Sequence, residues 1–326
     1  FKYAFNPRKP LLILRLIWNY IRILTGARLL RYVDIQVGHE CNMRCPHCFV
    51  DRYDDTQGPR IDGSTLEVTG VVDEAMKLGA VNFSFQGGEP LLYLNRPFLS
   101  HDLAYFVQAA KPDRNIISVA TNGTLIDEDM CKSLVRMGVD ILTVSVDEFR
   151  PVQHKDILDK ALVAKKCGLK VTLATVLTHQ NYHSPFIWEM IKFSERNKMI
   201  LNFILVTPIG KRENDIRVML LDEEIDALKQ WCKRFPYVRT DFDSCYRGSS
   251  CPAGTEVIYI KNDGSIQACP FLPRSFGNIR ITELWRARQR MIRSDILSSH
   301  RDICIAGEKR GKYLKPFIRE DLSYGP

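Results

Sequence analysis

Three cysteines stand close together near the start of the chain, and their spacing is that of a metal-binding loop. Cys41, Cys45 and Cys48 form a C-x3-C-x2-C pattern in a chain of 326 residues that has ten cysteines. Structural zinc sites use four ligands, commonly in paired C-x2-C knuckles, whereas this loop offers three thiols. Three cysteines on one loop suit a [4Fe–4S] cluster in which one iron has no protein ligand. Zinc binding and chance clustering of buried cysteines are the alternative interpretations.

The composition limits the class of protein that carries this loop. The chain has 46 Lys and Arg, 38 Asp and Glu and 45% hydrophobic residues, which is typical of a folded globular protein. Clustered cysteines favour metal ligation in a reducing compartment over a disulfide framework. The net charge of +8 is interpreted as diffuse, so no nucleic-acid partner is expected. There is neither a secretory signal nor an apolar run long enough to span a membrane, and we expect a cytoplasmic location.

The elements that must position the cysteine loop repeat along the chain. Short segments rich in Val, Ile, Phe and Thr predict strands at 32–37, 81–86, 117–121, 141–147, 170–177 and 201–208. Helical patterns lie between them at 66–78, 127–137, 155–166 and 186–197, and a further one lies at 222–233. This alternation predicts an α/β fold with parallel strands, a partial (β/α)6 TIM-like barrel. In such sheets the chemistry lies on loops that follow the carboxyl ends of the strands.

Two regions flank this repeat, and we expect three domains: a helical segment at 1–31, the barrel at 32–235 and a smaller domain at 236–326. Residues 8–24 form an amphipathic pattern, with Arg8, Arg15, Asn19 and Arg22 on one face and Leu11, Leu14, Trp18 and Ile21 on the other. Such a helix either packs across one end of the fold with its arginines solvated, or lies in a membrane interface as a peripheral contact. The last region contains a predicted hairpin of 256–260 and 265–268.

The cysteine loop and the end of the second strand together resemble the radical S-adenosylmethionine (radical SAM) superfamily. The second feature is Gln86-Gly87-Gly88-Glu89-Pro90, one strand–helix unit after the cysteines. The resemblance implies that the cluster binds S-adenosylmethionine and that one electron, from a reductant such as flavodoxin or ferredoxin, cleaves it. The resulting 5′-deoxyadenosyl radical then abstracts hydrogen from a substrate. Gly87 and Gly88 would permit close backbone approach, and Glu89 would accept a hydrogen bond from the methionine ammonium.

The resemblance also assigns cofactor contacts to later strand ends. Thr121 and Asn122 end the third strand, where the family has a second cofactor-contacting edge. Ser145 and Asp147 end the fourth, where the family places ribose and carboxylate contacts. His47 stands where an aromatic residue usually precedes the third cysteine, and its ring could stack near adenine. Ordinary turn chemistry at strand ends is the alternative interpretation of these residues.

A second group of cysteines surrounds the predicted hairpin. Cys251 and Cys269 stand at its ends, and with the Gly277-Asn278 and Leu284-Trp285 pairs they resemble the auxiliary-cluster domain called SPASM, or its shorter form, twitch. The resemblance implies one auxiliary [4Fe–4S] cluster, ligated by Cys251, Cys269 and Cys304. Cys245 is expected either as its fourth ligand or as a catalytic thiol that donates hydrogen to the substrate radical; a zinc site also stays open.

These features predict a radical SAM enzyme of the oxidoreductase or epimerase type. Its expected substrate is a peptide natural product, which would be epimerised or cross-linked, or a small-molecule metabolite, which would be dehydrogenated. An anionic sugar, a nucleotide or a lipid-linked molecule at a membrane surface is the alternative substrate class. An iron–sulfur electron carrier is the non-enzymatic alternative. Cys131, Cys167 and Cys232 lie in apolar surroundings and are predicted to be structural.

Overall fold

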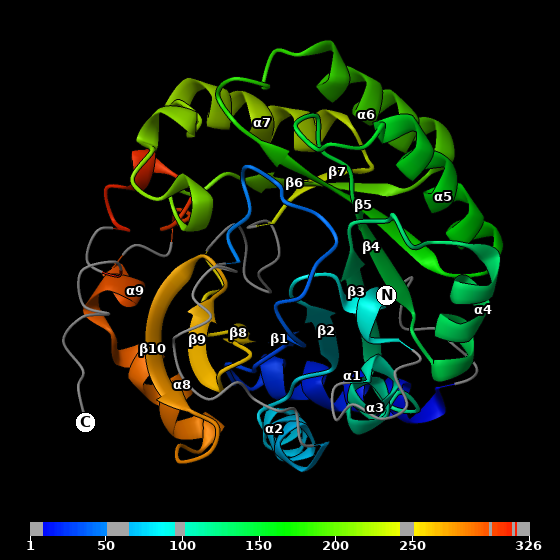
Figure 1. Cartoon of the computed structure of the whole chain (residues 1–326). Helices are drawn as coiled ribbons and strands as arrows, with labels where there is room; N and C mark the ends of the chain where they lie inside the picture. Colours follow the sequence, from blue (N-terminus) through cyan, green and yellow to red (C-terminus); the bar gives the residue numbers. More distant parts are fainter. Residues whose placement is uncertain are drawn as a thin grey trace.

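A single curved sheet of ten strands organises the molecule, and helices cover its convex outer face (Figure 1). The computed structural model describes residues 9–50, 65–94, 102–241, 251–299, 302–314 and 317. The strands are β1 (Tyr32–Gln36), β2 (Asn82–Gln86), β3 (Ile116–Thr121), β4 (Ile141–Ser145), β5 (Lys170–Leu177), β6 (Ile200–Leu205), β7 (Val238–Thr240), β8 (Val257–Ile260), β9 (Ser265–Cys269) and β10 (Leu272–Asn278). The helices are α1 (Pro10–Leu24), α2 (Thr65–Lys77), α3 (Leu103–Ala109), α4 (Glu128–Met137), α5 (His154–Lys166), α6 (Pro185–Asn197), α7 (Asp222–Arg234), α8 (Leu284–Arg293) and α9 (Asp295–Ser299).

The strand pairing confirms the predicted α/β partial barrel with a C-terminal hairpin. Strands β1 to β7 are parallel, and the sheet order is β10-β9-β8-β1-β2-β3-β4-β5-β6-β7. Antiparallel β8–β10 extend the same sheet, because β8 pairs in parallel with β1. The sequence did not predict α3, β7, β10, α8 or α9, and β7 joins the barrel sheet beyond the expected boundary at residue 235. The division into three domains stays a prediction.

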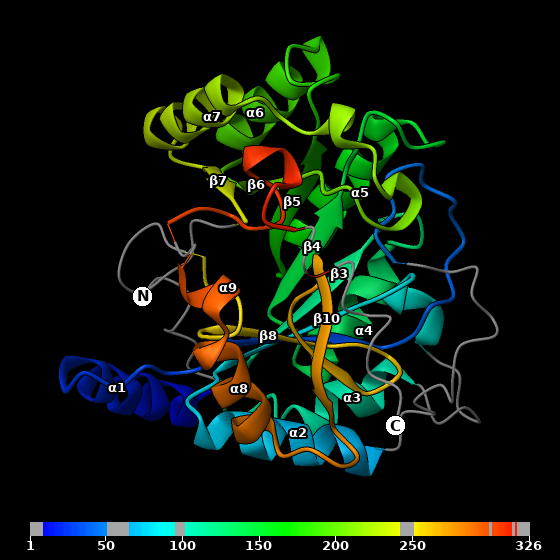
Figure 2. The same cartoon turned by 90° about the vertical axis from the view of Figure 1, so that its left-hand side faces the viewer.

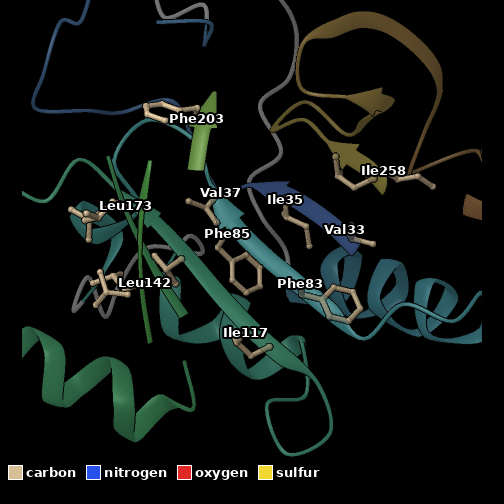
Figure 3. Close-up of a cluster of buried hydrophobic side chains, with 14 of the residues drawn as sticks. Val33, Ile35, Val37, Phe83, Phe85, Ile117, Leu142, Leu173, Phe203 and Ile258 are labelled. Atoms are coloured by element: carbon tan, nitrogen blue, oxygen red, sulfur yellow. The ribbon is translucent and has the colours of Figure 1, made fainter. Parts of the chain in front are cut away.

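Strand alternation gives the sheet two different faces. Figure 3 shows the apolar side chains of the outer face, among them Val33, Ile35, Phe83 and Phe85. The Phe85 ring lies 5.9 Å from the ring of Phe106 on α3, so this face packs against the helices. Successive side chains of a strand point to opposite faces. The residues between them therefore line the concave face, where the chain places its polar strand residues.

Local signals in the sequence set the ends of the barrel helices. The Asp127 carboxylate accepts a hydrogen bond of 2.7 Å from the amide of Met130 and caps α4 at its N-terminus. Gly138 ends the same helix in the left-handed conformation, with φ +95°, as its position after the helical pattern predicts. These caps hold α4 at a length that returns the chain to the amino end of β4.

Helix α1 packs with its polar face against the barrel, whereas one of the two interpretations of its sequence leaves the arginines in solvent. The interpretation with solvated arginines is wrong for Arg15, which donates 2.6 Å from Nη2 to the carbonyl of Ala80. Asn19 Nδ2 donates over 2.7 Å to the carbonyl of Gly79. Burial, with a smaller effect of Arg114, lowers the pKa of Arg15 to about 10. The polar face packs inward, where its side chains donate to carbonyls at the amino ends of the strands, and a carbonyl needs such a partner when buried.

Figure 2 shows α1 along the bottom of the molecule, near α2 and α8. Within the part of the chain that the structure describes, no helix is long and apolar enough to cross a membrane.

Candidate functional site

The cysteine loop, residues 37–50, follows β1 and lies inside the curve of the sheet (Figure 1). The turn after β2 holds its first part through the backbone. The amide of Gly88 donates over 3.0 Å to the carbonyl of Gly38, and the amide of Glu89 donates over 2.7 Å to the carbonyl of Glu40. The two motifs recognised in the sequence are therefore joined directly, by main-chain hydrogen bonds.

The two glycines of this turn are required by that contact. A Cβ atom on Gly88 would lie 1.9 Å from the carbonyl oxygen of Glu40, and one on Gly87 would lie 2.5 Å from that of Gly38. Gly87 also has φ +150°, which side chains rarely adopt. The expected close backbone approach is present, and its partner in the structure is the cysteine loop itself.

Glu89 joins the end of β2 to the end of β3. Its side chain is fully buried. It accepts hydrogen bonds from Thr121 Oγ1 at 2.7 Å, from the Asn122 amide at 2.6 Å and from the Leu91 amide at 3.1 Å. Burial raises the pKa of Glu89, although these donors favour its charged form. The carboxylate thus already has three protein donors, and its contact with a methionine ammonium stays a prediction.

Asn122 extends this connection to the first cysteine. Its Nδ2 donates over 2.8 Å to Asn42 Oδ1 and lies 3.8 Å from Cys41 Sγ, within hydrogen-bond range for sulfur. Asn122 Oδ1 accepts from the amide of Thr124 at 2.9 Å, which fixes the orientation of the amide group. The strand end predicted to contact a cofactor therefore contacts the cysteine loop.

His47 and Asp147, predicted as separate cofactor contacts, form one buried cluster with Arg150. His47 Nε2 lies 3.4 Å and Arg150 Nε 2.7 Å from Asp147 Oδ2, and the Val176 amide donates over 2.6 Å to Asp147 Oδ1. Burial alone would raise the pKa of Asp147, but Arg150, His47 and the Val176 amide outweigh it and lower the pKa to about 2.

The sequence reasoning missed Arg150, although a basic residue three positions after a strand-end carboxylate is a usable signal. Arg150 Nη1 also donates over 3.1 Å to the carbonyl of Ser145, so both predicted β4 residues are bound to it. His47 Nδ1 is buried without a hydrogen-bond partner among the described residues. A buried polar atom needs a partner, so this nitrogen suits contact with a bound cofactor.

The thiols of the loop suit a cluster better than a single metal ion. Cys45 is 5% exposed, and Cys41 and Cys48 are half-buried. Among the described residues, no group of three or more His, Cys, Asp or Glu side chains is arranged to hold one metal ion. Sulfurs around one zinc ion must all lie about 2.3 Å from it, whereas each thiolate of a [4Fe–4S] cluster binds a different iron. Three thiols supply one ligand to each of three irons, so the donor set fits a [4Fe–4S] cluster with one iron free of protein ligands; the cluster stays a prediction and zinc the alternative.

The second cysteine group lies close to the first. The ring of Phe49 meets that of Phe271 edge-on, with centroids 5.1 Å apart. Separately, the Cys48 carbonyl accepts from the amide of Lys211, which follows β6, at 3.1 Å. Phe49 follows the last cysteine of the loop and Phe271 lies two residues after Cys269. This aromatic contact therefore ties the cysteine loop to the hairpin.

Three of the four predicted auxiliary ligands, Cys251, Cys269 and Cys304, interact electrostatically, and their role as ligands stays a prediction. Burial raises the pKa of Cys269 and of Cys304 well above its ordinary value, and the neighbouring thiol of Cys251 adds to both shifts. The Gly307 amide donates over 3.3 Å to Cys304 Sγ. Neutral buried thiols become metal ligands by losing their protons as the cation binds. Cys245 lies outside the described residues, and its ligand or catalytic role stays a prediction.

Asp34 is a residue that the sequence reasoning missed. It lies on the concave face, in register with Ser84 on one side and Tyr259 on the other. Burial raises the pKa of Asp34 to about 7, although hydrogen bonds from Ser84 and Tyr32 oppose the shift. An acid in the middle of the alternating strand sequence YVDIQ is the signal that identifies it.

The three cysteines predicted to be structural lie in apolar surroundings. Cys131 is fully buried, and burial together with the neighbouring Cys167 raises its pKa to about 12. Cys167 and Cys232 are partly buried against the hydrophobic core. Neutral thiols of this kind pack as small hydrophobic groups.

Replacing Gly88 by Ala should detach the cysteine loop, because its Cβ would overlap the Glu40 carbonyl. We expect iron after anaerobic reconstitution to fall from about eight to about four per chain, with the hairpin cluster retained. Gly70→Ala is the matched control, since that helical glycine has nothing within 4 Å of its Cβ position. Full iron content in Gly88→Ala would show that the contact is not required.

The ion pairs of Asp147 should make stability depend on pH. Because its folded pKa is depressed from 3.8 to about 2, the stabilisation is complete above about pH 5 and disappears as pH falls from 4 to 2. We expect Asp147→Asn to unfold about 2 kcal/mol more easily at neutral pH, with the difference vanishing toward pH 2. Urea unfolding of metal-free protein measures this. The exposed Asp159→Asn is the control, and a pH-independent difference would contradict the prediction.

Comparison with known proteins agrees with this geometry. The model of the radical SAM superfamily matches residues 35–192, which include the cysteine loop and the glycine turn. A GTP 3′,8-cyclase of Clostridium perfringens is 26% identical over 193 residues, 57% of this chain and 58% of that protein. A PqqA peptide cyclase of Granulibacter bethesdensis is 28% identical over 156 residues, 45% of this chain and 39% of its own length. The matches thus span well under two thirds of these relatives.

Solved structures share the fold over more of the chain. SuiB of Streptococcus suis, bound to its precursor peptide SuiA, has a TM-score of 0.58 at 18% identity, covering 83% of this chain and 68% of SuiB. The anSMEcpe structure with bound AdoMet and the Cp18Cys peptide has a TM-score of 0.59 at 18% identity, covering 89% and 95%. With the cysteine loop, the glycine turn and the curved parallel sheet in place, the chain belongs to the radical SAM superfamily.

Proposed function

We propose that Cys41, Cys45 and Cys48 hold a [4Fe–4S] cluster that binds S-adenosylmethionine, and that the enzyme dehydrogenates a polar substrate on the concave face. The main support is the convergence of β2, β3 and β4 on the cysteine loop, through Gly88, Asn122 and Asp147 respectively. When bound, the cluster and S-adenosylmethionine supply the radical that removes a hydrogen atom from the substrate. The surrounding strand ends keep the loop in place and restrict access of water.

The concave face favours a substrate that forms hydrogen bonds. Polar side chains from β1 to β6 line it: Asp34, Gln36, Asn82, Ser84, Gln86, Ser118, Thr143, Ser145, Thr172 and Asn202. Asp34 is the one carboxylate on this face of these six strands, all of which the structure describes. Such a surface suits a peptide or a small polar metabolite with a hydroxyl or amino group beside the reacting carbon.

Asp34 is placed to act as the base of a dehydrogenation. A substrate that loses a hydrogen atom from carbon to the 5′-deoxyadenosyl radical must also release a proton and an electron before a double bond forms, and an auxiliary cluster on Cys251, Cys269 and Cys304 would accept that electron. With a pKa of about 7, the Asp34 carboxylate can accept that proton at neutral pH. Its neighbour Tyr259 is buried, and the thiols of Cys48 and Cys269 both contribute to raising its pKa. The Asp34 charge also contributes to raising the pKa of Cys269, so the acid lies near the hairpin cysteines, which supports oxidation over epimerisation.

Replacing Cys41, Cys45 and Cys48 together by Ala tests the initiating chemistry. We expect 5′-deoxyadenosine formation to fall to background, while the hairpin cluster keeps about four iron per chain. A variant with Ala at both Cys131 and Cys167 removes two thiols away from the site and should retain cleavage. Continued cleavage of S-adenosylmethionine in the triple variant would overturn the proposal.

Replacing Asp34 by Asn tests the proton acceptor. Both clusters and cleavage of S-adenosylmethionine should be retained, while product that has lost two hydrogen atoms falls by about a hundredfold or more. The wild-type rate should decline as pH falls below about 7, the pKa of Asp34, and this decline should be absent in the variant. Anaerobic incubation with candidate peptides and metabolites, followed by mass spectrometry, measures the product. Asp129→Asn, on the exposed surface of α4, is the control; equal turnover by Asp34→Asn would exclude the role.

A further inference from the structure

Helix α1 is held on the barrel by its polar face. The Lys9 ammonium, which precedes the helix and is 4% exposed, pairs with Asp140 and donates over 2.9 Å to the carbonyl of Asn115. Arg15 and Asn19 bind the carbonyls of Ala80 and Gly79. All these partners precede β2, β3 or β4 along the chain. The helix is therefore fixed at the amino ends of the strands, opposite the end that carries the cysteine loop.

The other face of α1 is apolar and exposed. We call it the α1 apolar face, formed by Leu11, Leu14, Ile17, Trp18, Ile21 and Leu24. Leu14 is 63%, Trp18 61% and Leu24 69% exposed. Of the thirteen large hydrophobic side chains that are exposed in the described chain, seven lie on this helix, Tyr20 being the seventh. Such a concentration marks an interaction surface, and Figure 2 shows the helix extending beyond its neighbours.

The excess positive charge of the protein belongs to the same segment. Residues 1–33 contain seven Lys and Arg and no Asp or Glu, whereas the rest of the chain has 39 Lys and Arg against 38 Asp and Glu. The charge is therefore not diffuse, as its total first suggests. Of the net +8, +7 accompanies α1, with Arg28 exposed just beyond the helix.

We propose that the α1 apolar face docks onto an anionic lipid bilayer and lies in its interface. Lys9, Arg15 and Arg31 of this segment bind groups within the protein, so half-buried Arg22 and exposed Arg28 are the described cations of the segment that a partner can reach. Anionic headgroups would neutralise these two charges, whereas a second copy of the chain would bring them together. The helix of 15 residues is about 22 Å long, too short to span a bilayer, but an apolar face with Trp18 and Tyr20 suits the headgroup level. In this orientation the bilayer lies at the amino ends of the strands, so the cysteine loop faces away from it.

Sedimentation of the full chain with vesicles tests the surface. We expect binding to vesicles of phosphatidylglycerol and phosphatidylcholine, weaker binding to phosphatidylcholine alone, and loss of binding as salt rises from about 0.1 M to about 0.5 M. The combined Leu14→Gln, Trp18→Gln and Ile21→Gln variant should bind at least about fiftyfold more weakly. Three exposed hydrophobic residues elsewhere provide the matched control: Tyr105→Gln, Phe149→Gln and Ile216→Gln should leave binding unchanged.

Two further measurements distinguish lipid binding from misfolding of the variant and from self-association. Circular dichroism and cleavage of S-adenosylmethionine should be the same in the α1 variant as in the wild type, because the exposed face contacts neither the core nor the cysteine loop. Wild-type protein should sediment as a monomer without lipid in analytical ultracentrifugation. Equal vesicle binding by the α1 variant would overturn the proposal. A wild-type dimer that the α1 substitutions dissociate would also overturn it, in favour of a second copy as the occupant.

Discussion

The whole site relies on the close approach of two backbone segments. The turn of Gly87 and Gly88 lies so near residues 38–40 that no side chain fits between them. Main-chain hydrogen bonds at 2.7 and 3.0 Å then fix the start of the cysteine loop to the end of β2. Because a loop with three predicted metal ligands has little core of its own, its position must come from neighbouring strand ends. The buried Glu89 then connects the end of β2 to the end of β3 through its hydrogen bonds with Thr121 and Asn122.

The same strand ends combine two roles: they hold the cysteine loop, and they stand where contacts with a cofactor are expected. Thr121, Asn122 and Asp147 stand where cofactor contacts are expected, yet the structure uses their polar groups to hold Glu89, Asn42 and His47. Hydrogen bonds within the protein fix these side chains before any cofactor binds, which lowers the entropy lost on binding. Among the described residues, Nδ1 of His47 has no hydrogen-bond partner, so the network still leaves a buried polar atom for a ligand.

Charge is distributed differently over the two edges of the sheet. At the carboxyl edge, Asp147 is buried but paired with Arg150, so its charge is retained. In the middle of β1, by contrast, burial raises the pKa of Asp34 to about 7. At the amino edge, cationic groups of the N-terminal segment satisfy backbone carbonyls. That arrangement turns the apolar side of α1 outward. The cysteine loop thus lies at the carboxyl edge of the sheet, and the exposed apolar face of α1 lies at the opposite, amino edge.

Local sequence patterns were sufficient to predict the elements of the parallel barrel sheet and most of the helices around it. Strand and helix periodicity predicted β1 to β6 and most of the helices, because hydrophobic alternation and helix caps are local signals. The spacing of Cys41, Cys45 and Cys48 is a local signal of the same kind, and it predicts a cluster loop. By contrast, α3, a helix of seven residues, and β7, a strand of three, were too short to show a clear period. The sequence also missed β10, α8 and α9, which follow the predicted hairpin.

The tertiary structure alone shows which side chains from distant parts of the chain contact one another. The fold pairs His47 with Asp147 and Arg150, places Asp34 between Ser84 and Tyr259, and joins the hairpin to β1. It also sets which face of α1 packs inward: the helical pattern shows two faces, but not the carbonyls of Gly79 and Ala80 that bind one of them. These contacts join residues far apart in the chain, and their geometry depends on sheet register and curvature, which no local pattern encodes.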